Sequence, residues 1–113
     1  MAMTKTDGPR LLVGWTTVET PEQADRLADG LVRSRLAACV QIDAPVTSHY
    51  VWKGKAEADR EIRIWTKFPE DRAEALETWL HQNHPYETPQ WLAVPAERVH
   101  PDYLAWAIEQ TRP

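Results

Sequence analysis

The loop His84-Pro85-Tyr86-Glu87 holds the densest group of side chains that can do chemistry in this chain. An imidazole and a carboxylate can bind a metal ion together, and the phenol can donate a hydrogen bond to a ligand. Loops with such residues carry function more often than core positions do. The alternative interpretation is a structural turn after a helix, in which the aromatic side chain fills a gap.

Cys39 is the single cysteine, so one chain can form neither an internal disulfide nor a zinc site of the CxxC type. A lone thiol is often a small buried hydrophobe. It is also a soft ligand for copper or zinc, which needs imidazole or carboxylate partners. No neighbour in the sequence supplies them, so a metal site with Cys39 has to be assembled by the fold or between chains.

Aromatic and charged side chains alternate along a predicted hairpin, residues 46–68. Tyr50 and Trp52 share one strand face, and Glu61 and Lys67 share one face of the returning strand. With Lys53 nearby, the pattern predicts a polar pocket with an aromatic wall. The alternative is an interface or a solvated face with ordinary cross-strand pairs.

Other function classes find little support. The sequence contains no GxGxxG, GxxxxGK[ST], HExxH or GxSxG motif. An enzyme of acylphosphatase type needs an arginine in the loop after the first strand, and residues 16–20 contain none. Arg63, Trp65 and Lys67 resemble a strand that stacks on RNA bases, but a net charge of −4 and the lack of a basic stripe argue against nucleic acid. We therefore expect a non-enzymatic protein that binds neither nucleic acid nor membrane.

The elements that position these residues follow from periodicity and breakers. Thr20-Pro21-Glu22-Gln23 forms a capping box, and apolar residues then recur at helical spacing. The predicted elements are strands over 11–18, 37–42, 46–55, 60–68 and 90–94, a turn over 54–59, and helices over 21–36, 70–82 and from 101 onward. This order predicts an α+β, ferredoxin-like β-α-β-β-α-β fold with a long β-hairpin and a C-terminal helix.

The 113 residues, 42% hydrophobic and 27% charged, suit one globular domain. We expect a flexible tail over residues 1–10 and a single domain over 11–113. The tail lacks the apolar segment of a secretory signal, and a free cysteine suits a reducing compartment, so the expected location is the cytoplasm. Because strands that extend beyond their own sheet leave unpaired edges, the hairpin predicts an oligomer.

Five ordered stretches resemble the CutA divalent-cation-tolerance family. They are RLAACVQI (35–42), TSHYVWKGK (47–55), EIRIWTKF (61–68), HPYETPQWLAVP (84–95) and YLAWA (103–107). Their order and spacing agree with that family over about residues 11–109. The chain departs from the family pattern at Pro45 and Ala56, at Phe68-Pro69, and at Trp15 and Trp79. The last two positions are cysteine in some relatives, which argues against a multi-cysteine metal site here.

The resemblance implies a homotrimer similar to the PII signalling proteins, in which hairpin strands pair between subunits. It also implies tolerance of copper and other divalent metals, and no catalytic reaction. Cys39 and His84 match possible metal contacts of the family, to which the loop adds Glu87. Trp52, Glu61, Lys67 and Tyr86 match residues near the intersubunit clefts, and strand parity adds Tyr50.

Two functions remain open at this point. The first is a homotrimer that binds Cu(II) or another divalent ion, with threefold copies of one side chain completing a site. The alternative is a PII-like trimer that senses a small anionic metabolite in its intersubunit clefts through Lys53, Lys67 and Trp52. Neither function requires an organic cofactor.

Overall fold

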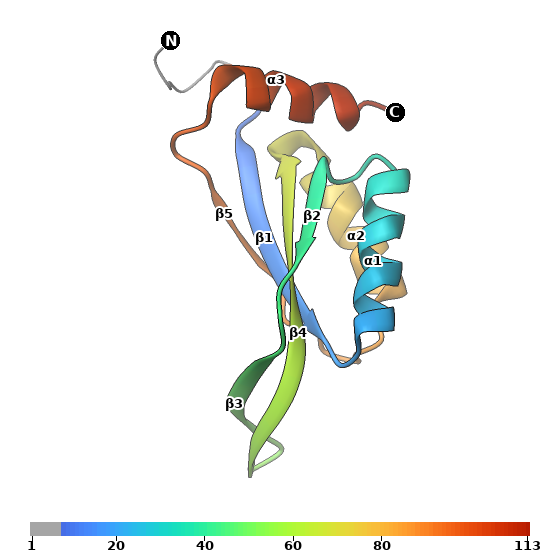
Figure 1. The fold of residues 1–113 in the computed structure, drawn as a ribbon, viewed down its shortest axis with the longest axis vertical. Coiled ribbons are helices and arrows are strands. Elements are labelled where there is room, and N and C mark those ends of the chain that lie inside the picture. Colours follow the sequence, from blue (N-terminus) through green and yellow to red (C-terminus); the bar gives the residue numbers. More distant parts are fainter. Residues whose placement is uncertain (1–7) are drawn as a thin grey trace.

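The computed structural model describes residues 8–113, which form one antiparallel sheet with three helices (Figure 1). The strands are β1 (Leu11–Val18), β2 (Cys39–Ile42), β3 (Val46–Trp52), β4 (Lys55–Pro69) and β5 (Leu92–Pro95), and the helices are α1 (Pro21–Arg33), α2 (Ala73–Asn83) and α3 (Pro101–Gln110). The strand order is β2-β4-β1-β5, and β3 pairs with the outer half of β4. β1 and β2 flank β4 antiparallel to it, which is the ferredoxin-like arrangement that the sequence predicts.

α1 begins at the predicted capping box. The Gln23 amide donates to the Thr20 hydroxyl, and the Gln23 side-chain oxygen accepts from the Thr20 amide. The helix ends at Arg33, three residues before the predicted end, because Arg35 adopts a left-handed conformation with φ of 57°. That turn directs Leu36 into the core, where it is buried.

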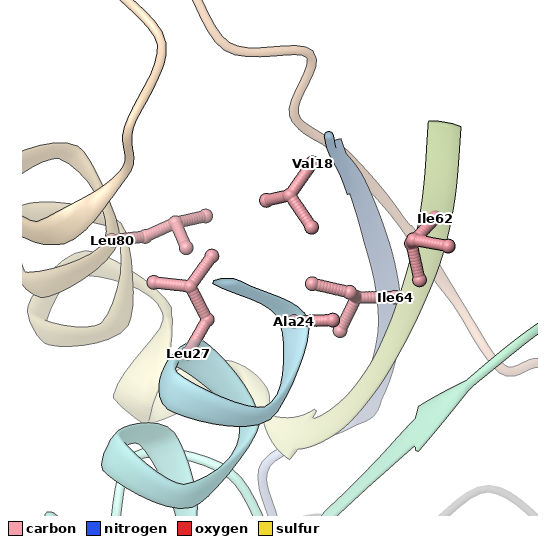
Figure 2. Packing of buried hydrophobic residues seen from close by; sticks show 6 residues of the cluster. All are labelled: Val18, Ala24, Leu27, Ile62, Ile64 and Leu80. Carbon is pink, nitrogen blue, oxygen red and sulfur yellow. The ribbon is translucent and has the colours of Figure 1, made fainter. Parts of the chain in front are cut away.

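The core lies between one face of the sheet and the helices α1 and α2. Figure 2 shows one cluster of this core, in which Val18, Ile62 and Ile64 of the sheet meet Leu27 of α1 and Leu80 of α2. The two helices approach closely at Gly30. A Cβ atom there would lie 2.4 Å from the Trp79 ring, so the glycine admits the indole.

Among residues 8–113, the opposite face of the sheet is covered at one end, where α3 crosses it (Figure 1). Leu11 and Ala38 pack there against Leu104 and Ala107. Further along this face, Trp15 of β1 lies beside Trp65 of β4 with ring centroids 5.0 Å apart.

The hairpin of β3 and the outer half of β4 projects from this body (Figure 1), and it makes the molecule 49 Å long but only 26 and 23 Å across. The predicted turn over 54–59 is wrong: the turn is Lys53-Gly54 alone, with φ of 50° and 80°. Two successive positive φ values are typical of the tight type I′ turn of hairpins. Residues 55–59 continue as strand, because a hairpin open to solvent accepts polar side chains.

Other boundaries also differ from prediction, such as β2, which begins at Cys39 rather than residue 37. Pro69 ends β4, and the residues after it, Glu70–Arg72, form a 3-10 turn before α2. The last strand begins at Leu92 rather than residue 90, since Trp91 packs over Gly14 and stacks on Phe68 instead of pairing. Within residues 8–113 no helix is long and apolar enough to cross a membrane.

Candidate functional site: an acidic cleft at the base of the hairpin

A cleft of about 840 Å³ lies where the hairpin leaves the body. Its walls come from the end of β1, from both hairpin strands and from the loop after α2. The lining residues are Thr17, Glu19, Ser48, His49, Tyr50, Trp52, Asp59, Arg60, Glu61, Tyr86, Glu87, Thr88 and Gln90.

His84 anchors the loop that forms one wall. Its Nδ1 accepts the Tyr86 backbone N–H at 3.0 Å, which leaves the proton of the neutral ring on Nε2. Nε2 lies 2.9 Å from the buried Thr16 hydroxyl and donates to it. Burial lowers the pKa of His84, although the Thr17 backbone and the Glu61 carboxylate act in the opposite direction. His84 is therefore a neutral, buried residue that positions Tyr86.

Tyr86 and Glu61 form the floor of the cleft. The Tyr86 hydroxyl donates to Glu61 Oε2 at 2.9 Å, and burial together with this carboxylate raises the pKa of Tyr86. Glu61 is only 9% exposed, because it stands where β4 enters the body. The phenol thus stays protonated and holds the carboxylate in place.

Tyr50 and Trp52 form the outer wall. In the hairpin register Ser48 pairs with Asp59 and Val46 with Glu61, so the carboxylates of β4 share a face with Tyr50 and Trp52. The Tyr50 hydroxyl donates to Asp59, and this bond raises the pKa of Tyr50 to about 12. Both rings remain partly exposed, at 42% for Tyr50 and 45% for Trp52.

Four of the five predicted cleft residues thus meet in one cavity: Tyr50, Trp52, Glu61 and Tyr86. Lys67 does not join them, since it pairs with Cys39 in the sheet and donates to Gln41 at 2.8 Å. Lys53 lies at the turn, where its Nζ is 5.9 Å from the centre of the Trp52 ring.

The three predicted metal ligands are not brought together within one chain. Cys39 shares the sheet face of Lys67, and it is half-buried beside Tyr103 of α3. His84 contacts Thr16, whose side chain points to the opposite, helix-covered face. Glu87 is exposed at the cleft. Among residues 8–113 no three His, Cys, Asp or Glu side chains are grouped to hold a metal ion.

Sequence reasoning missed two carboxylates of the cleft, Glu19 and Asp59. A two-residue turn at Lys53-Gly54 would have identified Asp59, because that register pairs it with Ser48 on the face of Tyr50. Glu19 follows directly after β1, at the strand end that meets the loop of His84. Its place could be inferred only once that loop was located.

A family model described as CutA1 divalent ion tolerance protein matches residues 12–110. The chain belongs to the CutA family. A divalent-cation tolerance protein CutA from Pectobacterium atrosepticum is 42% identical over 83 residues, covering 74% of this chain and 76% of the relative. A protein CutA homolog from Xenopus laevis is 36% identical over 96 residues, covering 85% of this chain but only 64% of that longer protein.

Solved structures of CutA proteins share this fold. The crystal structure of CutA1 from Oryza sativa superimposes with a TM-score of 0.89 at 33% identity, covering 95% of this chain and 98% of that one. The predicted resemblance to the CutA family and the predicted fold class are therefore confirmed.

Proposed function

We propose that this protein is a non-enzymatic homotrimer that binds divalent cations and takes part in the response to metal ions. Membership of a family named for divalent-cation tolerance supports the general role. The observation that carries the proposal is the charge of the cleft, whose lining includes four carboxylates, Glu19, Asp59, Glu61 and Glu87, and one guanidinium, Arg60. Carboxylates attract divalent ions and repel anions, so this charge disfavours the anionic metabolite as the occupant.

The trimer is part of the proposal because a single chain has an unpaired strand edge and an exposed apolar surface. On the described residues, the outer half of β4 pairs with β3 on one side only, and Leu92, Val94 and Trp106 are exposed on the body. Free strand edges and apolar patches favour pairing with another copy. Copies related by a threefold axis can also add the ligands that one chain lacks.

The metal site that we propose uses Glu87 and Glu19 at the mouth of the cleft, with further ligands from neighbouring copies. His84 is a less suitable ligand in this conformation, since both ring nitrogens already make hydrogen bonds. Cys39 remains a candidate from a neighbouring chain, and Cu(II) and Zn(II) are the ions to test. We also propose a cytoplasmic location, which suits the free thiol.

Isothermal titration of the full chain with Cu(II) and Zn(II) tests the metal site. We expect Glu87→Gln to weaken binding by roughly tenfold, because a charged ligand is lost. Glu97→Gln, which removes an equally exposed carboxylate away from the cleft, is the matched control. Equal binding by wild type and Glu87→Gln would refute the site. Sedimentation at 13.0 kDa, the mass of one chain, would refute the trimer.

A further inference from the structure

The loop between α2 and β5 is attached to the body by a single buried side chain. In the stretch from residue 81 to residue 95, His84 is the only buried residue. Among the described residues, the backbone–backbone hydrogen bonds of loops and turns include none made by residues 85–90. This loop is therefore held by side-chain contacts, and the buried imidazole is the main one.

The contact between His84 and the loop requires a neutral ring. Nδ1 lies 3.0 Å from the backbone nitrogen of Tyr86, which can only donate, so Nδ1 must present its lone pair. A second proton on the ring would occupy that lone pair and bring two donors face to face. The bond to the Tyr86 backbone would then be lost, whereas Nε2 would still donate to Thr16. Protonation of His84 therefore acts on the loop and spares the contact with β1.

The groups that surround His84 come from β1, β4, α2 and the loop itself. The end of β1 presents neutral threonines, and α2 presents the Leu80 carbonyl, which accepts from the His84 backbone. Glu61 of β4 is a carboxylate that favours the charged ring, and the phenol ring of Tyr86 lies 5.0 Å from the imidazole centre. Desolvation outweighs the carboxylate, so the pKa of His84 lies below its ordinary value of 6.5 and the ring is neutral at pH 7.

We infer that His84 is a pH-sensitive switch for the wall of the cleft that residues 85–90 form. The neutral ring holds this loop against the sheet, and the doubly protonated ring lets it move away. Tyr86 then leaves Glu61, because its backbone is no longer held, and the cleft opens on the side of the loop. The inference goes beyond the proposed metal binding, since it concerns how the cleft opens, whatever the cleft binds.

A pH titration of the full chain labelled with ¹⁵N, observed by NMR without added metal, tests the switch. At pH 7 the ring nitrogens of His84 should show the neutral form with its proton on Nε2. As the pH falls, the amide signals of Tyr86, Glu87 and Thr88 should shift with the same midpoint as the His84 ring, below pH 6.5. The amide signals of α1 should not follow this midpoint. Loop amides that do not respond while the ring takes up its proton would overturn the inference, as would a ring that stays neutral until the protein unfolds.

Three variants show which contact carries the response. His84→Gln should abolish the shared midpoint of the loop amides, and the exposed control His81→Gln should keep it. Tyr86→Phe removes the phenol bond to Glu61 but keeps the backbone bond to Nδ1, so its loop should still respond. A response that persists in His84→Gln, or that is lost in Tyr86→Phe, would overturn the inference.

The wild-type titration needs no substitution, so the test stands even where a variant fails to fold, which circular dichroism of each variant detects. The switch and the proposed metal site also fail separately. The pH titration contains no metal, and the Cu(II) and Zn(II) titrations are made at neutral pH, where the loop is held. A loop that does not respond to pH would thus refute this inference and leave the metal site standing.

Discussion

The body and the hairpin of this protein use the same strand, β4, in opposite ways. From Ile62 to Pro69 it pairs with β1, and from Ile64 to Lys67 also with β2, so alternate side chains enter the core. From Lys55 to Glu61 it pairs with β3 alone, and nearly every side chain before Glu61 faces solvent. The change occurs at Glu61, where the cleft lies.

This difference explains why a site forms at the junction. The body fixes positions by close packing, as at Gly30 and Trp79, but leaves little room for a ligand. The hairpin offers exposed aromatic and charged groups without a core to enclose them. At the junction, the anchored loop of His84 and the buried end of β4 hold Tyr86 and Glu61 rigidly against the open hairpin. The cleft combines a fixed floor with an accessible wall.

The largest expected effect on stability comes from a substitution in the packed body, compared with one in the exposed hairpin. Phe68→Ala removes a fully buried ring that stacks on Trp91, and it should lower the free energy of unfolding by about 3–5 kcal/mol. Val51→Ala in the hairpin, where the valine is 70% exposed, should change it by less than about 0.5 kcal/mol. Urea unfolding at one fixed protein concentration measures both. A Val51→Ala effect close to that of Phe68→Ala would show that the hairpin is enclosed by another copy.

A smaller effect on stability concerns His84, which anchors the loop at the junction of body and hairpin. This effect depends on pH. Because burial places the folded-state pKa of His84 below its ordinary value of 6.5, the unfolded chain binds the proton first as the pH falls. The stability that neutral His84 contributes is complete above pH 6.5 and decreases as the pH falls from there toward the folded-state pKa. We therefore expect a lower Tm at pH 5 than at pH 7.

Replacing the imidazole isolates this contribution. His84→Gln keeps a donor that can reach Thr16 but cannot take up a proton, so the difference in Tm between pH 7 and pH 5 should shrink. His81→Gln, a change on the exposed surface of α2, should keep the full difference. An unchanged pH dependence in His84→Gln would contradict the assignment of His84 as the neutral anchor.

The sequence predicted the body better than the junction. Local chemistry sufficed for α1, since Thr20 and Gln23 are three residues apart and cap the helix as expected. The contact between His84 and Thr16 joins residues 68 positions apart and depends on where a proline-containing loop returns. The hydrophobic periodicity of the sequence does not show where that loop comes back to the sheet. The sequence could therefore predict which residue types form the floor of the cleft, but not their arrangement.

Strand parity also reached its limit at the hairpin. It correctly placed Tyr50 and Trp52 on one strand face, and the register of the hairpin brings Glu61 onto that same face. It grouped Lys67 with Glu61 as well, which is true for the sheet face but not for the cleft, since six residues of strand separate them by about 20 Å. Strand parity predicts the sheet face on which a side chain lies. Its position along the strand determines whether it reaches the same cavity as another residue on that face.

The smallest expected effect tests whether the hairpin is a separate unit of stability. Lys53 adopts a φ of 50° in the two-residue turn, a conformation that asparagine tolerates better than lysine. Lys53→Asn should stabilise the hairpin by a few tenths of a kcal/mol up to about 1 kcal/mol. Hydrogen exchange should slow at the amides of β3 and stay unchanged in α1 and β1. Lys53→Ala, which removes the ammonium but not the strain, is the matched control and should show no slowing. Slower exchange throughout the body in Lys53→Asn would mean that body and hairpin unfold together. The two halves of β4 would then differ in side-chain packing but not in their stability toward local unfolding.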